Sequence, residues 1–265
     1  MNQKQSKGTA VVTGASSGIG AVYADRLARR GYDVALVARN EQRLHALADR
    51  LRDATGRAVH VIKADLTDKS DLASVETRLK RDASISLLVN NAGFAAVSPL
   101  LASDVGTMES MIDLNVTALM RLTYAAVPAM VERGSGAVIN IASIVAIGPE
   151  ILNGVYGASK AFVLAFNQSM QHELAGKGIR VQAVLPGATD TELWEIAGMP
   201  KGQIPPSRFM SAEDMVDAAL AGFDSGEVVT IPPLQDGDDW IRYEASRNEL
   251  RQRFAHAKPG ARYLV

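Results

Sequence analysis

The sequence contains no cysteine, and aromatic residues make up only 5% of its 265 residues. Without cysteine there is no disulfide, thiolate nucleophile or cysteine metal site. The four histidines, His45, His60, His172 and His256, are scattered without the spacing of metal ligands. We therefore expect no metal site.

An excess of charge of one sign is also absent, because 28 basic and 29 acidic residues leave a formal net charge of −1. We therefore expect neither nucleic acid nor an anionic membrane surface as a partner. No apolar run approaches the ~18 residues that span a bilayer, and the polar residues 1–7 are expected to form a flexible N-terminus. These features predict a cytoplasmic protein.

The stretch Thr13–Gly20 holds three glycines between an apolar run at 10–12 and a helical pattern. Glycine lets the backbone turn tightly and approach a ligand, and a helix N-terminus offers unpaired N–H groups to a phosphate. Apolar residues spaced about one turn apart from Ile19 to Leu27, and a second apolar run at 34–38, follow it. This order favours a dinucleotide-binding βαβ unit; an ordinary strand-to-helix turn is the alternative.

The rest of the chain alternates apolar runs with amphipathic helical patterns. Further strands are expected at 58–63, 85–89, 137–142, 179–185 and 227–231, and further helices at 41–55, around 72–79, at 107–133 with a bend at Pro128, and at 156–175. We predict one α/β domain over residues 1–265, a Rossmann-type doubly wound fold. Its seven-stranded, mainly parallel sheet carries helices on both faces.

Two segments stand apart from this alternation. Residues 192–211 are rich in glycine and proline and are expected to form a lid over the substrate. Residues 234–265 form a charged C-terminal extension, which is either a solvated helix, a contact between subunits or a cover over the pocket of a neighbouring subunit.

Three side chains are candidates for acid–base chemistry. Tyr156 and Lys160 lie four residues apart, on one face of the predicted helix. A nearby ammonium lowers the pKa of a phenol, so the pair can exchange a proton with a carbinol or carbonyl oxygen. Ser143, at the end of the strand 137–142, can orient the same oxygen. The non-catalytic interpretations are helix packing for Tyr156, a solvated charge for Lys160 and a helix cap for Ser143.

Seven motifs occur in an order that resembles the short-chain dehydrogenase/reductase family of nicotinamide-dependent oxidoreductases. They are TGASSGIG at 13–20, DLTD at 65–68, NNAG at 90–93, Asn115, Ser143, YGASK at 156–160 and PGATDT at 186–191. The resemblance covers residues 7–231 and implies a doubly wound domain with a nicotinamide cofactor.

The resemblance also implies roles for individual residues. Tyr156 is the acid/base, Ser143 polarises the substrate oxygen, Lys160 tunes Tyr156 and holds the nicotinamide ribose, and Asn115 supports a water-linked proton relay. The cofactor-binding residues it implies are Gly14, Ser16, Ser17, Gly18, Ile19, Gly20, Asp65, Leu66, Asn91, Ala92, Gly93, Tyr156, Lys160, Pro186, Gly187, Thr189 and Thr191. From the sequence alone Asn115 is a buried helix amide or a kink, and Asn90 is expected to tie strands together.

The end of the second strand indicates which nicotinamide cofactor binds. An acidic residue there would bond a free ribose 2′-OH and repel a 2′-phosphate, but the chain has Ala38 followed by Arg39. Because arginine binds phosphate bidentately, we predict NADP(H) over NAD(H). The alternative is that Arg39 is a solvated arginine, and Ser17 adds no charge where many NADP-preferring relatives carry a second basic residue.

We therefore predict an NADP(H)-dependent oxidoreductase that acts on a carbonyl or secondary alcohol. Apolar residues at 94–100, 144–155 and 192–210 indicate a small, largely apolar substrate. A non-catalytic NADP(H)-binding regulator, or a lyase or epimerase that retains its cofactor, are the alternatives. The family resemblance implies a homodimer or homotetramer.

Overall fold

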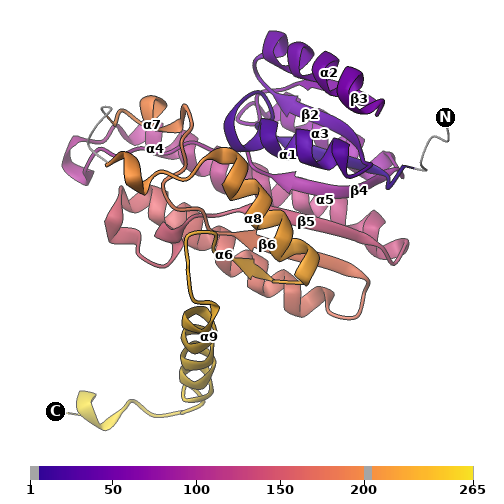
Figure 1. The fold of residues 1–265 in the computed structure, drawn as a ribbon. Helices are drawn as coiled ribbons and strands as arrows, with labels where there is room; N and C mark the ends of the chain where they lie inside the picture. The colour runs from indigo at the N-terminus through magenta and orange to yellow at the C-terminus, as the bar shows by residue number, and fades with distance from the viewer. Residues whose placement is uncertain (1–5, 200–204, 265) are drawn as a thin grey trace. The chain divides into compact units, whose positions relative to one another are not determined.

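Seven strands form one sheet in the computed structural model, which describes residues 6–199 and 205–264. They are β1 (Thr9–Thr13), β2 (Asp33–Ala38), β3 (Val59–Lys63), β4 (Ile85–Asn90), β5 (Gly136–Ile141), β6 (Ile179–Val184) and β7 (Val229–Thr230). Their order is β3-β2-β1-β4-β5-β6-β7, and every pairing is parallel (Figure 1). The predicted doubly wound α/β class is confirmed.

Helices connect the strands. The α-helices are α1 (Gly18–Arg29), α2 (Glu41–Thr55), α3 (Lys69–Arg81), α4 (Val105–Ile112), α5 (Leu119–Glu132), α6 (Gly154–Leu174), α7 (Leu193–Ile196), α8 (Ala212–Ser225) and α9 (Gly237–Gln252). Short 3-10 turns are η1 (Leu100–Ala102), η3 (Ile144–Ala146), η4 (Pro149–Ile151), η5 (Pro206–Arg208) and η6 (Ala261–Tyr263), and η2 (Asp113–Ala118) is π-helical. The side chains of Asn40, Asp68, Asn153 and Ser211 cap α2, α3, α6 and α8, because each accepts a bond from a first-turn N–H.

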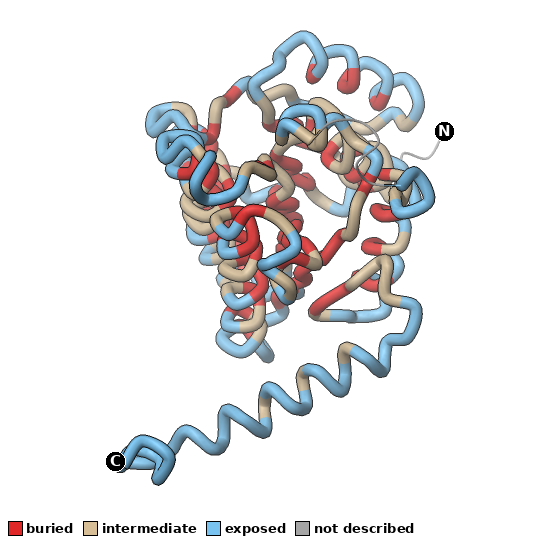
Figure 2. Tube along the Cα trace, turned by 90° about the vertical axis from the view of Figure 1, so that its left-hand side faces the viewer, coloured by how far each residue is buried: buried red, intermediate tan, exposed pale blue. Residues whose placement is uncertain are grey.

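Successive residues of each strand enter two different cores, one on each face of the sheet. Val12 and Leu36 pack with α1, α2 and α8, whereas their neighbours Val11 and Ala35 pack with α3, α5 and α6. This alternation follows from the two-residue period of a strand, and Figure 2 shows buried residues on the strands and on one side of the covering helices. Burial on both faces explains why the strands are almost wholly apolar.

The helix predicted at 107–133 is interrupted. It consists of α4, the π-helical η2 and α5, so that the backbone bonds widen around Asn115. An apolar stripe with a spacing of three to four residues does not reveal where the hydrogen-bond spacing changes to five. The predicted seventh strand, 227–231, is also shorter, because only Val229 and Thr230 pair with β6.

The segment Val105–Glu132 is long and apolar enough to cross a membrane by length and composition. Its apolar residues have a place in the fold, however. Leu122, Ala126 and Met130 are buried in the core that also contains Leu88 of β4 and Val138 of β5. Packing against the sheet therefore accounts for the apolar character of this segment.

A chain of amides crosses the centre of the sheet at β4 and β5. The Nδ2 of Asn90 donates to Oδ1 of Asn140 (2.9 Å) and to the Thr123 hydroxyl (3.0 Å). The Nδ2 of Asn140 donates in turn to Oδ1 of Asn167 (3.1 Å), whose own amide donates to the Val228 carbonyl (3.2 Å). Asn90 thus ties strands together, as the sequence predicts, and joins them to α5 and α6.

The chain divides into two compact units, at Pro232 and Pro233. The second unit corresponds to the predicted C-terminal extension and holds α9 and η6. Parts of two predicted segments lie outside the described residues: 1–5 of the N-terminus and 200–204 of the predicted lid.

Breaking the amide chain should destabilise the sheet. Asn140→Ala leaves the Asn167 carbonyl and one donor of Asn90 without their partner, and Asn140 is fully buried. We expect a loss of about 2–4 kcal/mol in the free energy of unfolding, measured by urea denaturation. Asn167→Ala is the matched variant. The double variant should lose less than the sum of the two, since both remove one shared bond, and strict additivity would contradict this account.

Candidate active site

The strand order reverses direction between β1 and β4, and the polar contacts there shape the glycine turn. The Thr13 hydroxyl accepts from the backbone N–H groups of Asn91 (2.9 Å) and Ala92 (3.0 Å). The Nδ2 of Asn91 donates to the carbonyls of Thr13 (2.8 Å) and Gly14 (3.3 Å). Ligands of doubly wound folds bind at this reversal, outside the carboxyl ends of the strands.

The glycines of the turn leave no room for side chains. A Cβ on Gly20 would lie 2.3 Å from the Gly14 carbonyl oxygen, and one on Gly14 would lie 2.8 Å from Nδ2 of Asn91. Gly14 and Gly18 also have φ of 66° and 51°, which favour glycine. The side chain of Ser17 does not cap α1, and the first turn carries no acidic residue. The backbone N–H groups at the start of α1 thus remain available to a phosphate, so the turn fits a pyrophosphate.

Other predicted cofactor-binding residues, in this turn and after β4, have structural roles too. Ser16 is half-buried, and Ile19 packs against the core formed by α1, α2 and α8. Ala92 packs against the opposite core. Ile19 and Ala92 can therefore contribute backbone groups to a nucleotide while their side chains support the fold.

The three candidate acid–base residues meet at the carboxyl end of the sheet. Ser143 follows β5, and Tyr156 lies in the first turn of α6, with Lys160 one turn later. All three are buried, at 9%, 7% and 6% exposure. The Lys160 ammonium donates to the Ile141 carbonyl (2.9 Å) and lies 5.8 Å from the centre of the Tyr156 ring. Ser143 also accepts from the N–H of Val145 (3.4 Å), so it caps η3 as well.

Burial controls the ionisation of this group. It raises the pKa of Tyr156 to about 12, opposed by a hydrogen bond from Ser143. It lowers the pKa of Lys160 to about 8, because desolvation disfavours the charged form. The expected lowering of the Tyr156 pKa by Lys160 is therefore wrong for this structure. The Lys160 ammonium donates to a carbonyl, and Ser143 is the group that favours the phenolate.

Asn115 is a buried amide within the π-helical segment and holds the loop after β4. Its Oδ1 accepts from the Phe94 N–H (3.0 Å), and its Nδ2 donates to the Phe94 carbonyl (2.9 Å) and the Ser159 hydroxyl (3.2 Å). A Cβ on Gly93 would lie 2.8 Å from Oδ1 of Asn115 and 3.6 Å from Nζ of Lys160. Gly93 thus lets the loop approach both side chains.

The segment after β6 closes another side of the site. The carbonyl of Pro186 accepts from the Ile144 N–H (3.0 Å) and the Ser143 hydroxyl (3.4 Å), which fixes the loop that carries Ser143. Thr189 is buried, and its hydroxyl donates to the Gly187 carbonyl (3.3 Å). The methyl of Thr191 lies against Gly18 of the glycine turn.

Both ends of the predicted lid 192–211 are tied to this segment. Thr189 forms a parallel bridge with Met210, whose N–H donates to the Ala188 carbonyl (2.9 Å). The indole N–H of Trp194 donates to the Thr189 carbonyl (2.8 Å). The described ends of the lid are therefore anchored beside the catalytic group.

The predicted adenosine side lies at the ends of β2 and β3. Arg39 is 77% exposed at its side chain and lies 3.9 Å from the Asp65 carboxylate. Burial raises the pKa of Asp65, but bonds from Thr67 and the charge of Arg39 leave it below its usual value. Leu66 is buried in the core, so its backbone, rather than its side chain, is available to an adenine.

Sequence reasoning missed two contacts. Arg43, in the first turn of α2, donates to Glu192 (2.7 Å) at the start of the predicted lid. Asn153 caps α6 and also donates to the Ser98 carbonyl (2.6 Å). Arg43 looked like a helix-surface residue, and nothing in the sequence links it with a residue 149 positions away. The position of Asn153 just before a helical pattern was a cap signal.

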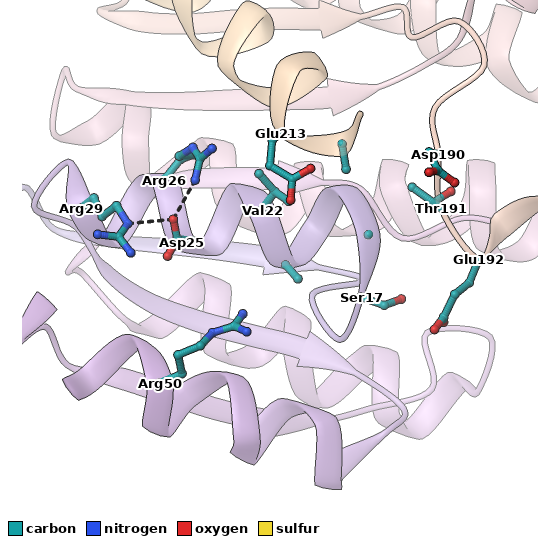
Figure 3. Close-up of a pocket in the computed structure, with 13 residues that line it drawn as sticks. Ser17, Val22, Asp25, Arg26, Arg29, Arg50, Asp190, Thr191, Glu192 and Glu213 are labelled. Atoms are coloured by element: carbon teal, nitrogen blue, oxygen red, sulfur yellow. Dashed lines mark hydrogen bonds and ion pairs between the residues drawn. The ribbon is translucent and has the colours of Figure 1, made fainter. Parts of the chain in front are cut away.

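A pocket of about 540 Å³ runs along α1 (Figure 3). Two of its basic residues have an acidic partner, since Arg26 and Arg29 both donate to Asp25 (3.0 and 2.8 Å). Figure 3 shows the Glu192 side chain extending toward Ser17, and bonds from Arg43 and then Ser17 lower the pKa of Glu192. Only the end of this pocket next to Ser17 belongs to the predicted nucleotide site.

A family model of the short chain dehydrogenases matches residues 8–199. The chain belongs to this family. An uncharacterized oxidoreductase of Staphylococcus epidermidis is 35% identical over 80% of this short-chain dehydrogenase and 88% of its own length. This is the family that the sequence motifs predicted. In this chain the glycine turn lies at the same edge of the sheet as Ser143, Tyr156 and Lys160.

Two solved structures resemble this short-chain dehydrogenase over nearly its whole length. A short-chain dehydrogenase from Sphingobium yanoikuyae in complex with NADPH is 48% identical, covering 97% of this chain and 99% of its own, with a TM-score of 0.94. A bulky-bulky ketone specific alcohol dehydrogenase from Comamonas testosteroni is 42% identical, covering 98% and 100%, with a TM-score of 0.91.

The burial of Lys160 should make stability depend on pH. Its pKa is about 8 in the folded chain and about 10.4 when unfolded, so the unfolded chain binds more protons between these values. The free energy of unfolding therefore rises with pH across this window. Relative to Lys160→Met, the native chain should gain about 2 kcal/mol between about pH 7 and about pH 10 in urea denaturation.

Lys177→Met is the control for this experiment, because Lys177 is an exposed lysine. Its difference from the native chain should stay constant over the same pH range. A Lys160→Met difference that is equally constant would show that Lys160 titrates normally in the folded state.

Proposed function

We propose that this protein is an NADP(H)-dependent oxidoreductase that transfers a hydride between the nicotinamide and a carbonyl or secondary alcohol. The observation that carries the proposal is the meeting of Ser143 and Tyr156 at the carboxyl end of the sheet, with Lys160 one turn from the phenol. The reversal of strand order and the uncapped glycine turn lie at the same edge. Membership of the short-chain dehydrogenase family supports this reaction class.

The glycine turn and the ends of β3, β4 and β6 would hold the nucleotide. The proposed contacts are those implied by the family: Gly14, Ser16, Ser17, Gly18, Ile19, Gly20, Asp65, Leu66, Asn91, Ala92, Gly93, Pro186, Gly187, Thr189 and Thr191, with Tyr156 and Lys160 at the nicotinamide ribose. When bound, the nicotinamide donates or accepts the hydride. The NADPH complex of the Sphingobium relative supports NADP(H), and Arg39 is the proposed partner of the 2′-phosphate.

Tyr156 carries the proton of the reaction. A buried phenol with a pKa of about 12 is protonated at neutral pH, so it donates its proton to the carbonyl oxygen while the carbon receives the hydride. The resulting phenolate is stabilised by the Ser143 hydroxyl. In the oxidative direction the phenolate takes the proton back from the alcohol. Asn115 is the proposed support of the water-linked relay that returns this proton to solvent.

The substrate side of the site is apolar. Phe94, Leu152, Val155 and Leu193 pack around a buried cluster that contains Tyr156, which favours a largely apolar molecule. The Comamonas relative is a dehydrogenase of bulky-bulky ketones. We therefore propose a ketone with an apolar substituent on each side of the carbonyl, or the corresponding alcohol.

The proposal includes a homodimer or homotetramer in the cytoplasm. A nicotinamide cofactor must be exchanged with the surrounding solution, which is consistent with that location.

Replacing the acid–base residue tests the proposed reaction directly. With a panel of ketones and aldehydes, the native chain should consume NADPH, followed by its absorbance, and Tyr156→Phe should lower kcat by about 10²–10⁴-fold. Binding of NADPH, measured by fluorescence titration, should remain nearly unchanged. Tyr124→Phe is the control, because Tyr124 is 68% exposed and lies on α5, outside the site.

Two outcomes would contradict the proposal. Turnover that survives in Tyr156→Phe would remove this residue from the acid–base role. Tight NADPH binding without consumption by any carbonyl substrate would favour a regulatory protein.

Arg39→Leu tests the choice of cofactor. Charge-assisted bonds to a phosphate contribute about 1.5–3 kcal/mol each, so the ratio of kcat/KM for NADPH over NADH should fall by about 10–100-fold. Arg50→Leu is the control, because Arg50 lies within α2 and not at the end of β2. It should leave the ratio unchanged. An unaltered ratio in Arg39→Leu would assign the 2′-phosphate to another group, and Arg43 is the nearest arginine in sequence.

A further inference from the structure

Helix α9 is 16 residues long, and none of its residues is buried; Figure 2 shows an almost entirely exposed helix near the C-terminus. Isolated helices shorter than about 12–15 residues are marginal in water, and α9 is only slightly longer. Yet α9 carries large apolar side chains, among them Ile241 and Leu250, which are 63% and 54% exposed.

Several apolar side chains on α9 and just after it follow a heptad spacing. Trp240, Tyr243 and Leu250 lie on α9 and Phe254 lies just beyond its end. Together with Arg247 they are separated by alternating steps of three and four residues. This spacing produces one seam along a helix, as in coiled coils. Trp240 and Tyr243 stack with their ring centres 5.1 Å apart. Arg247 donates to Glu244 (2.8 and 2.7 Å), which neutralises the charge within the seam.

The two ends of α9 carry opposite charge, and Arg242 and Glu249 between them pair with Asp239 and Arg253. Asp236 caps the helix, and Asp238 and Asp239 lie in the first turn. Arg251 lies in the last turn, followed by Arg253. In an antiparallel pair of identical helices the acidic end of each lies beside the basic end of the other, whereas a parallel pair brings like charges together.

We propose that α9 is an interface between two copies of this chain, paired antiparallel through the seam Trp240, Tyr243, Arg247, Leu250 and Phe254. A twofold axis beside Ala245 then places Trp240 opposite Leu250 of the second copy and Tyr243 opposite Arg247. Asp239 and Arg253 flank the seam on the same side, just before Trp240 and Phe254, so the same register brings Asp239 beside Arg253 of the second copy. Such a contact is self-complementary, as twofold symmetry requires.

The segment that carries α9 is shared with a solved relative. The family model ends at residue 199, but the match with the Sphingobium structure covers 97% of this chain. Since residues 233–265 make up more than a tenth of the chain, that match includes most of them. The extension is therefore a structural element common to both proteins.

Aspartate in the seam should weaken self-association. Trp240→Asp and Leu250→Asp, measured in the full chain by sedimentation over a concentration series, should each raise the dissociation constant by about tenfold or more. Ile241→Asp is the matched control, because Ile241 is as apolar and exposed but lies outside the seam. It should leave the constant unchanged, and all three variants should keep the melting temperature of the native chain.

Introduced cysteines test the orientation, because the native chain has none. Trp240→Cys/Leu250→Cys should form a covalent dimer under mild oxidation, since the two positions are about 15 Å apart on one helix and link only between copies. Neither single variant should form one. Arg242→Cys/Gln252→Cys, with the same spacing on another face, is the control.

Three results would overturn the proposal. One is a native chain that stays monomeric over the concentration series. Another is equal weakening by Ile241→Asp, or none by the seam variants, which would make α9 a solvated helix held by its own ion pairs. The third is a covalent dimer of either single cysteine variant, which would mean parallel pairing.

Discussion

The Thr13 hydroxyl joins the two strands at which the sheet changes its winding direction. By accepting from the N–H groups of Asn91 and Ala92, it fixes the end of β4 against the end of β1. The Asn91 amide in turn holds the carbonyls of the glycine turn. The positions of the turn, of Gly93 and of the loop that meets Asn115 all follow from this joint. A binding edge built from separate strands thus has the geometry of one rigid element.

The catalytic residues are buried, and only Tyr156 has a hydrogen-bond partner that opposes the effect of burial on its pKa. Buried ionisable side chains resist becoming charged, and the raised pKa of Tyr156 and lowered pKa of Lys160 both have this cause. Ser143 opposes the effect only at the phenol. The site thus keeps its proton on Tyr156 at rest, where a carbonyl oxygen can receive it, and provides a hydroxyl beside the charge that this transfer creates.

Much of the fold could be predicted from the spacing of apolar residues and from the residues that begin and end each helix and strand. Apolar runs predicted the strands within a residue or two, because burial on both faces leaves few polar positions, although the two-residue β7 was expected to be longer. Strand ends and helix starts also placed Ser143, Tyr156 and Lys160 at one edge. Contacts between distant side chains were not predictable: the pair Arg43 and Glu192 joins surface residues whose partners no local pattern specifies. The bond of Lys160 to the Ile141 carbonyl likewise depends on how α6 packs on β5.

The π-helical segment Asp113–Ala118 positions one amide without disturbing the helices on either side of it. A π turn accommodates an extra residue in a helix without changing the phase of the α-helical parts on either side. Met111, which packs in the cluster around Tyr156, and the core face of α5 therefore both face their partners. Deleting one residue here would restore α-helical spacing and leave the two flanks in phase. The loss would be local, because the widened backbone is what holds the Asn115 amide against Phe94.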